Sequence, residues 1–98
     1  MEKRIPVEEK QSRVDELNGW KLEDDKFIVK RYRFKEFLTG IDFVNKIASY
    51  SEEIQHHPFI SIDYKMVTLK LTSWNAKGLT YLDLECADHY DELYQEYK

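Results

Sequence analysis

The residues in this chain best suited to chemistry are two adjacent histidines followed by a proline, His56, His57 and Pro58. Proline disfavours the helical conformation for the residue before it, so a helix arriving from Phe34 should end at about His56 or His57. Imidazole gains and loses protons near neutral pH, and two imidazoles in unlike surroundings can serve as one acid and one base. The sequence therefore predicts a candidate acid/base pair at a helix C-terminus.

Glu52 is expected to distinguish the two imidazoles. On a helix that continues to His56, Glu52 would face that residue at the i, i+4 spacing, and the helix end would also favour a positive charge there. His57 lies beyond the predicted helix end, with no counter-charge close to it in the sequence. These arguments make His56 the predicted proton donor. In the alternative interpretation, His56 only caps the helix and His57 is a solvated loop residue.

Three more residues extend the pattern downstream, namely Tyr64, Trp74 and Asp83. Together with Glu52 and the His-His-Pro triplet, in this spacing, they resemble the signature of the pterin-4a-carbinolamine dehydratases. The run from Leu71 to Thr80 is also similar to the strand, glycine turn and helix start of that family. The similarity in layout covers most of the chain.

The resemblance implies a reaction. Enzymes of this family remove water from 4a-hydroxytetrahydropterin (4a-hydroxytetrahydrobiopterin), the product left by aromatic amino acid hydroxylases, and form quinonoid dihydropterin in tetrahydrobiopterin recycling. The resemblance implies that no metal or cofactor is used. His56 and His57 would share two proton transfers, one to the departing 4a-hydroxyl and one from ring nitrogen N5.

Trp74 departs from many family members, which carry a third histidine at this place. An indole cannot exchange protons near pH 7, but it donates a hydrogen bond through Nε1 and offers a flat surface for stacking. We therefore assign Trp74 to substrate binding. Glu52 and Asp83 are further candidates, because a carboxylate suits the parallel N–H donors of a pterin's amino-pyrimidine edge. Alternatively, Glu52 orients His56, and Asp83 completes a helix capping box with Thr80.

Hydrophobic periodicity predicts the order helix, two strands, helix, two strands, helix, which is typical of an α+β layer. The resemblance implies the same class, a four-stranded antiparallel sheet with three helices packed on one face. Trp74 has the parity of the polar positions of the preceding strand, so it should lie on the less apolar face. The predicted elements are helices over 6–17 and 34–55, hairpins over 20–34 and 60–72 with a reversal at Lys65 and Met66, and a last helix from Thr80.

Apolar stripes indicate which helix faces are buried. The stripe of the first helix contains Val7, Val14 and Leu17, and Lys30 interrupts the alternation of the second strand. Cys86 falls on the stripe of the last helix with Leu82, Tyr90, Leu93 and Tyr97, which favours a small core residue over a nucleophile. The predicted sheet-facing stripe of the middle helix is Phe37, Leu38, Ile41, Val44, Ile47 and Ala48.

Composition limits the classes of partner. The chain has 98 residues and a formal net charge of −4, so we expect a single domain over residues 1–98 and no direct nucleic-acid partner. One cysteine excludes an internal disulfide, and the charged N-terminus lacks a signal-like apolar run, so we expect a cytoplasmic protein without membrane association. Seven tyrosines and two tryptophans exceed what one small core can hide, which predicts a homodimer or homotetramer.

Two other classes of function are alternatives to the dehydratase. Some animal relatives in the family that this chain resembles also act as dimerisation partners of a transcription factor, so the chain could be a non-catalytic pterin-binding or protein-dimerisation module of the same fold. A metal site at His56 and His57 is disfavoured, because adjacent residues rarely converge on one ion and no cysteine lies near them.

Overall fold

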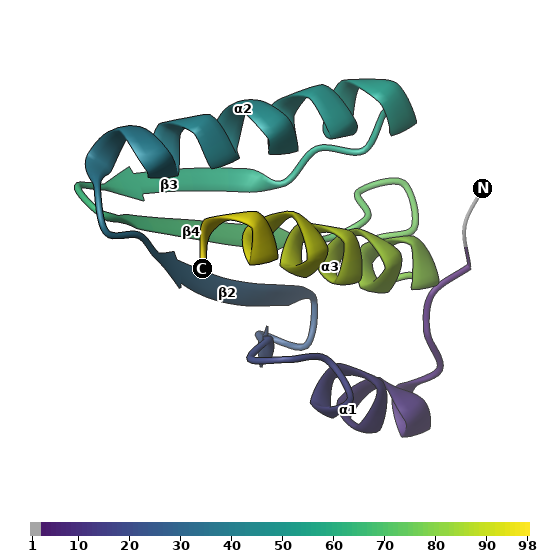
Figure 1. The fold of residues 1–98 in the computed structure, drawn as a ribbon. Coiled ribbons are helices and arrows are strands. Elements are labelled where there is room, and N and C mark those ends of the chain that lie inside the picture. The colour runs from purple at the N-terminus through teal and green to yellow at the C-terminus, as the bar shows by residue number, and fades with distance from the viewer. Residues whose placement is uncertain (1–2) are drawn as a thin grey trace.

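The computed structural model describes residues 3–98. In this range three α-helices and four β-strands follow one another in the predicted order, with a short 3-10 helix at the end (Figure 1). Their bounds are α1 Val7–Asp15, β1 Lys21–Glu23, β2 Phe27–Arg33, α2 Phe37–Ile54, β3 Phe59–Asp63, β4 Met66–Leu71, α3 Tyr81–Tyr94 and η1 Gln95–Tyr97.

The four strands form one antiparallel sheet in the order β1-β2-β4-β3, which confirms the α+β class. α2 and α3 lie over one face of the sheet, and α1 lies beside β1 at its edge (Figure 1). The core forms where β2 and β4, the two central strands, meet the helices. Its members from these elements are Ile28, Tyr32, Val67, Leu69, Leu71, Phe43, Ile47, Cys86, Ala87 and Tyr90.

The buried face of α2 differs from the predicted stripe. Its buried residues are Gly40, Phe43, Ile47 and Ser51, whereas Leu38 is 74% exposed. The reason is Gly40, where a Cβ atom would lie 3.3 Å from the Phe34 ring and 3.5 Å from Val67. Because glycine permits this close approach, α2 turns its glycine face to the sheet. Of the predicted stripe, Ile47 is buried, Ile41 and Val44 are half-buried, and Phe37, Leu38 and Ala48 are exposed.

Lys30 lies on the core-facing side of β2 between Ile28 and Tyr32. Its Nζ atom is 2.8 Å from an Asp91 carboxylate oxygen on α3, and the Tyr32 hydroxyl donates to the same oxygen. A half-buried ammonium is tolerated when it is paired and hydrogen-bonded. The lysine that interrupts the apolar alternation therefore joins the sheet to α3 without changing which face of β2 is buried.

Three predictions about edges and ends were wrong. Every residue of β3 is exposed, so this edge strand is not half-buried, and the β3–β4 reversal is at Tyr64 and Lys65, one residue earlier than predicted. In α1, Val14 is fully buried but Val7, in the first turn, is 82% exposed. Short edge elements have few neighbours to cover their apolar positions.

The C-terminus of α2 sets the course of the chain into the histidine pair. The helix ends at Ile54, earlier than predicted, because Gln55 adopts the left-handed conformation with φ 54°. The next amide, that of His56, donates to the Ser51 carbonyl oxygen at 3.1 Å, as in a Schellman motif. His56 therefore lies outside the helix.

We predict that Gln55→Gly raises the free energy of unfolding by about 0.5–1 kcal/mol, because glycine adopts a left-handed conformation without the steric cost of a Cβ atom. Urea denaturation measures the change. The matched control is Gln95→Gly at the end of α3, where φ is −57° and glycine offers no such relief. The control should be destabilised, and destabilisation in both variants would contradict the prediction.

Candidate functional site

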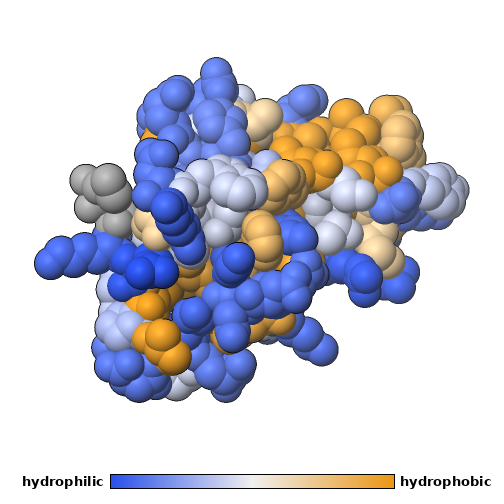
Figure 2. Space-filling view, turned by 180° about the vertical axis from the view of Figure 1, so that it is seen from behind, coloured by the Kyte–Doolittle hydropathy of each residue, from blue (hydrophilic) through white to orange (hydrophobic). Residues whose placement is uncertain are grey.

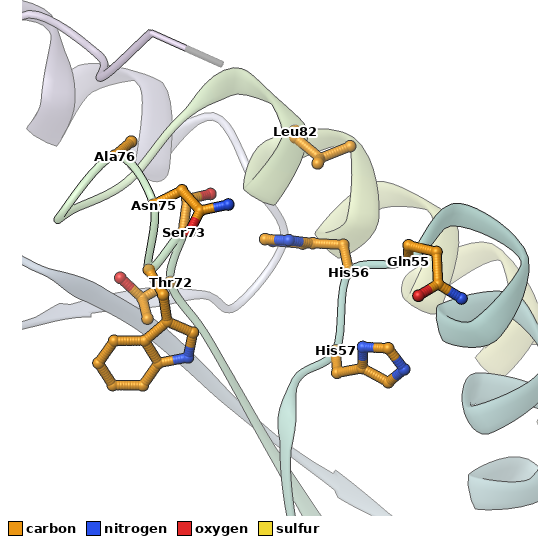
Figure 3. Close-up of a pocket in the computed structure, with 9 residues that line it drawn as sticks. Gln55, His56, His57, Thr72, Ser73, Asn75, Ala76 and Leu82 are labelled. Atoms are coloured by element: carbon orange, nitrogen blue, oxygen red, sulfur yellow. The ribbon is translucent and has the colours of Figure 1, made fainter. Parts of the chain in front are cut away.

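A cavity of about 370 Å³ opens between the C-terminus of α2, the chain that follows β4 and the start of α3. Figure 3 shows eight of its lining residues by name. A cavity of this volume is within the range of small-molecule sites. Its lining residues are Gln55, His56, His57, Thr72, Ser73, Trp74, Asn75, Ala76 and Leu82.

His56 pairs with Asp83, whereas the sequence predicted Glu52 as its partner. The His56 Nε2 atom lies 2.6 Å from Asp83 Oδ1, and the side chain of His56 is 14% exposed. Since a carboxylate oxygen only accepts hydrogen bonds, Nε2 carries the hydrogen of this contact. Nδ1 is then the nitrogen that can exchange a proton with a bound molecule. The left-handed turn at Gln55 causes the change of partner, because it removes His56 from the helical face of Glu52.

Asp83 is fully buried, and both of its carboxylate oxygens have partners. Oδ2 accepts hydrogen bonds from Ser73 Oγ at 2.8 Å and from the Thr80 backbone N–H at 2.9 Å. The Thr80 side chain in turn accepts from the Asp83 backbone, which completes the predicted capping box. Because Ser73 gives its one hydrogen to Asp83, it accepts in its 2.8 Å contact with Thr80 Oγ1. Asp83 therefore holds His56 in position but does not itself line the cavity.

His57 has a counter-charge that the sequence did not predict. Its Nε2 atom lies 2.5 Å from Glu52 Oε2, and the two side chains are 52% and 73% exposed. Figure 3 shows the His56 ring extending toward Ser73 and Asn75, and the His57 ring turned the other way. Each imidazole is thus paired with a carboxylate. The His56–Asp83 pair is largely buried, and the His57–Glu52 pair is at the surface.

Trp74 lies on the helix-free side of the sheet, as its parity predicted, and is 66% exposed. Its ring is edge-on to Phe27 and Phe59, with centroids 6.3 and 5.7 Å away. Lys70 Nζ lies 4.2 Å from the Phe27 ring centroid. These contacts leave most of the indole uncovered, so the aromatic group forms a wall at the mouth of the cavity that a flat ligand can stack on.

Comparison with known proteins identifies the family. Residues 3–93 match the family described as pterin 4 alpha carbinolamine dehydratase. The chain belongs to this family. It is 40% identical over 93 residues to a Picosynechococcus sp. protein assigned to pterin-4-alpha-carbinolamine dehydratase, covering 95% of this chain and 100% of that one. It is 38% identical over 94 residues to a Koribacter versatilis protein with the same assignment, covering 96% and 99%.

Two solved structures are similar to this chain. The crystal structure of a transcriptional coactivator/pterin dehydratase from Brucella melitensis has a TM-score of 0.85 and 28% identity, covering 92% of this chain and 97% of that one. A pterin dehydratase-like protein identified as a RuBisCO assembly factor in the alpha-carboxysome has a TM-score of 0.68 at 22% identity, covering 79% and 90%. Because of its low sequence identity, the similarity to the second structure shows a shared fold only.

Tyr64, Cys86 and His89 do not line the cavity. Tyr64 is 68% exposed in the β3–β4 turn and does not line the cavity. Cys86 is buried in the core as predicted, and burial raises the pKa of its thiol to about 12, so it stays protonated at neutral pH. His89 is half-buried and stacks on Tyr50, with ring centroids 3.9 Å apart. Over residues 3–98, no group of three or more histidine, cysteine or acidic side chains is arranged to hold a metal ion.

The sequence patterns do not indicate Ser73 or the two phenylalanines beside Trp74 as part of the site. Ser73 follows β4 directly, and its proximity to the Thr80 capping box depends on the hairpin formed by reciprocal hydrogen bonds between Ser73 and Gly78. Gly78 was a visible signal for that turn. Phe27 begins β2 and Phe59 begins β3, the two strands that pair with β4, and only the strand register brings them to Trp74. None of the helices in the described range is long and apolar enough to cross a membrane.

We predict that Asp83→Ala lowers the free energy of unfolding by about 2–4 kcal/mol, because the buried donors of Ser73 and Thr80 lose their acceptor and the capping box is broken. Urea denaturation provides the measurement. The matched variant Glu52→Ala removes the exposed carboxylate of the other pair and should change stability by less than about 0.5 kcal/mol. Equal effects of the two substitutions would refute the difference in burial on which the prediction depends.

Proposed function

We propose that the chain catalyses the dehydration of a 4a-hydroxytetrahydropterin to the quinonoid dihydropterin. The observation that carries the proposal is the His56–Asp83 pair at the wall of a cavity of about 370 Å³, in a chain of the pterin carbinolamine dehydratase family. Asp83 holds the Nε2 atom of an imidazole that lines the cavity, so Nδ1 is the nitrogen left for proton exchange. A carboxylate that fixes the tautomer and orientation of a histidine is a recurrent arrangement for proton transfer.

The reaction requires two proton transfers and no change in oxidation state. One proton is delivered to the 4a-hydroxyl as the C4a–O bond breaks and water leaves, and one is removed from N5 as the C4a–N5 double bond forms. Two imidazoles can supply both steps. The argument that made His56 the proton donor depended on a place in the last helical turn and on a Glu52 contact. In the structure His56 lies outside the helix, and Glu52 contacts His57 instead. The proposal therefore assigns the two transfers to His56 and His57 together.

The remaining candidate residues have supporting roles. Trp74 binds the pterin ring by stacking and transfers no proton, since an indole does not titrate near neutral pH. Asp83 positions His56 and does not contact the substrate, in contrast to the binding role expected from sequence, because its carboxylate is buried and bonded on both oxygens. Glu52 is at the surface, where it orients His57. The expected cytoplasmic location stays a prediction.

The test is the dehydration of a 4a-hydroxytetrahydropterin that a hydroxylase generates in the assay. We predict that His56→Gln and His57→Ala each lower turnover by about 100-fold or more, the scale of losing one general acid or base. The His56→Gln amide can still donate to Asp83, so this variant removes proton exchange without leaving the buried carboxylate unpaired. His89→Ala, which is outside the cavity, is the control with unchanged turnover. No turnover in the wild-type protein would favour the non-catalytic module.

Trp74→Ala is predicted to weaken substrate binding more than it slows the bound reaction. Loss of an aromatic contact costs about 0.5–1.5 kcal/mol beyond burial, so KM should rise several-fold to about tenfold with a smaller change in kcat. Steady-state kinetics separates the two constants. An unchanged KM accompanied by a shift in the association state would assign Trp74 to a subunit contact instead.

We also propose that the chain forms a homo-oligomer through α2 and β3. β3 is an edge strand on which Ile60 and Ile62 are 37% and 40% exposed, and α2 exposes Phe37 at 44% and Leu38 at 74%. Figure 2 shows apolar side chains gathered in the upper part of the molecule, where α2 and β3 lie. An uncovered edge strand beside an apolar helix surface is a site at which proteins associate.

Sedimentation velocity tests this proposal. At micromolar concentration the wild-type chain should sediment as a dimer or tetramer, and Leu38→Glu should shift it to the monomer because a charge then replaces apolar contact area. The matched variant Val7→Glu alters another highly exposed apolar residue, on α1, and should leave association unchanged. A monomeric wild-type chain would exclude the oligomer.

A further inference from the structure

A second cavity, of about 340 Å³, lies on the other side of the loop that carries Trp74 and is lined by cations from four separate segments. Arg4 comes from the N-terminal segment, Lys10 from α1, Lys26 from the β1–β2 turn and Lys77 from the loop that follows β4. The lining thus contains four cationic side chains and two acidic ones, those of Asp24 and Asp25. In a chain whose net charge is −4, this is a local excess of positive charge.

The four cations have no carboxylate partner among the residues that the structure describes. None of them takes part in the salt bridges found within residues 3–98. Lys10 Nζ donates to the backbone carbonyl of Asp25 at 2.8 Å, which positions the ammonium without neutralising it. Cations gathered around a cavity repel one another unless an anion is shared among them.

The fold fixes one of these side chains and provides room for another. Lys10 is fixed by its bond to the β1–β2 turn. Arg4 lies against Gly78, where a Cβ atom would meet Arg4 Cδ at 3.3 Å, so the absence of a side chain at this glycine provides the room for the arginine. A guanidinium presents a planar fork of donors that matches the oxygens of phosphate, and ammonium groups add point charges to it.

We propose that this cavity binds the phosphate group of a small organic phosphate. A phosphate has enough acceptor oxygens to be shared by several cations, and the volume falls within the range of small-molecule sites. The site is distinct from the histidine cavity, whose lining shares no residue with it. Asn75 and Ala76 line the histidine cavity, and Lys77 and Gly78 line the phosphate cavity. The bound phosphate therefore restrains the same short loop that holds Trp74.

Isothermal titration calorimetry with inorganic phosphate and with ribose 5-phosphate tests the proposal, with sodium chloride at matched ionic strength as the blank. Saturable binding of one phosphate group per chain is expected. Tighter binding of ribose 5-phosphate than of inorganic phosphate would show that the natural ligand is an organic ester, and equal binding would show that the free ion suffices. Absence of saturable binding of both compounds would overturn the proposal.

Two variants locate the site. Lys26→Gln and Lys77→Asn remove charges whose side chains make no hydrogen bond or ion pair in the described residues, and asparagine tolerates the φ of 60° at position 77. Each should weaken phosphate binding roughly tenfold, the scale of one lost charge-assisted hydrogen bond. Lys35→Gln removes an exposed lysine outside the cavity and should bind as the wild type does. Equal weakening in all three would mean nonspecific attraction and would refute the site. The result does not depend on dehydratase activity.

Discussion

The buried carboxylate of Asp83 is the interaction on which the candidate site depends. It closes the N-terminus of α3, receives the hydroxyl of Ser73 and holds His56. A buried charge is costly unless its oxygens are fully hydrogen-bonded, and here both are. Folding and the orientation of the imidazole are therefore coupled through one side chain. The carboxylate that closes the start of the helix through Oδ2 also holds the histidine through Oδ1.

The second carboxylate–histidine pair has the same groups as the first but lies at the surface. Glu52 and His57 are as close together as Asp83 and His56, yet both remain exposed to water. Solvent competes for their hydrogen bond and screens their charges, so such a pair contributes little to stability. One imidazole is consequently fixed in position, and the other keeps more freedom to move. The two histidines beside the cavity therefore differ in how rigidly the protein holds them.

The sequence predicted the features that depend on local patterns. The order of helices and strands, the alternation in β4, the capping box at Thr80 and the parity of Trp74 all follow from spacing along the chain. The partners of the two histidines did not follow. They depend on the left-handed conformation of Gln55, which is not a glycine and so gives no signal in the sequence.

Contacts between segments far apart in the chain could not be predicted from the sequence either. The orientation of α2 depends on Gly40 approaching Phe34 and Val67, and the apolar stripe alone could not reveal that the glycine side would face the sheet. The same holds for the cations around the second cavity, which come from four segments that only the fold brings together. A helix stripe gives the number of apolar residues, and tertiary packing decides which of them are covered.

The position of Trp74 has a consequence for how this site can change during evolution. Its backbone carbonyl accepts the Lys77 amide in the tip of a hairpin, while its ring lies outside the core. Its side chain can therefore be exchanged without disturbing the packing that maintains the protein. Asp83 has no such freedom, since its loss would affect folding before any effect on substrate could be selected. The protein thus separates a surface position at the cavity, whose side chain is free to vary, from a buried position that folding holds constant.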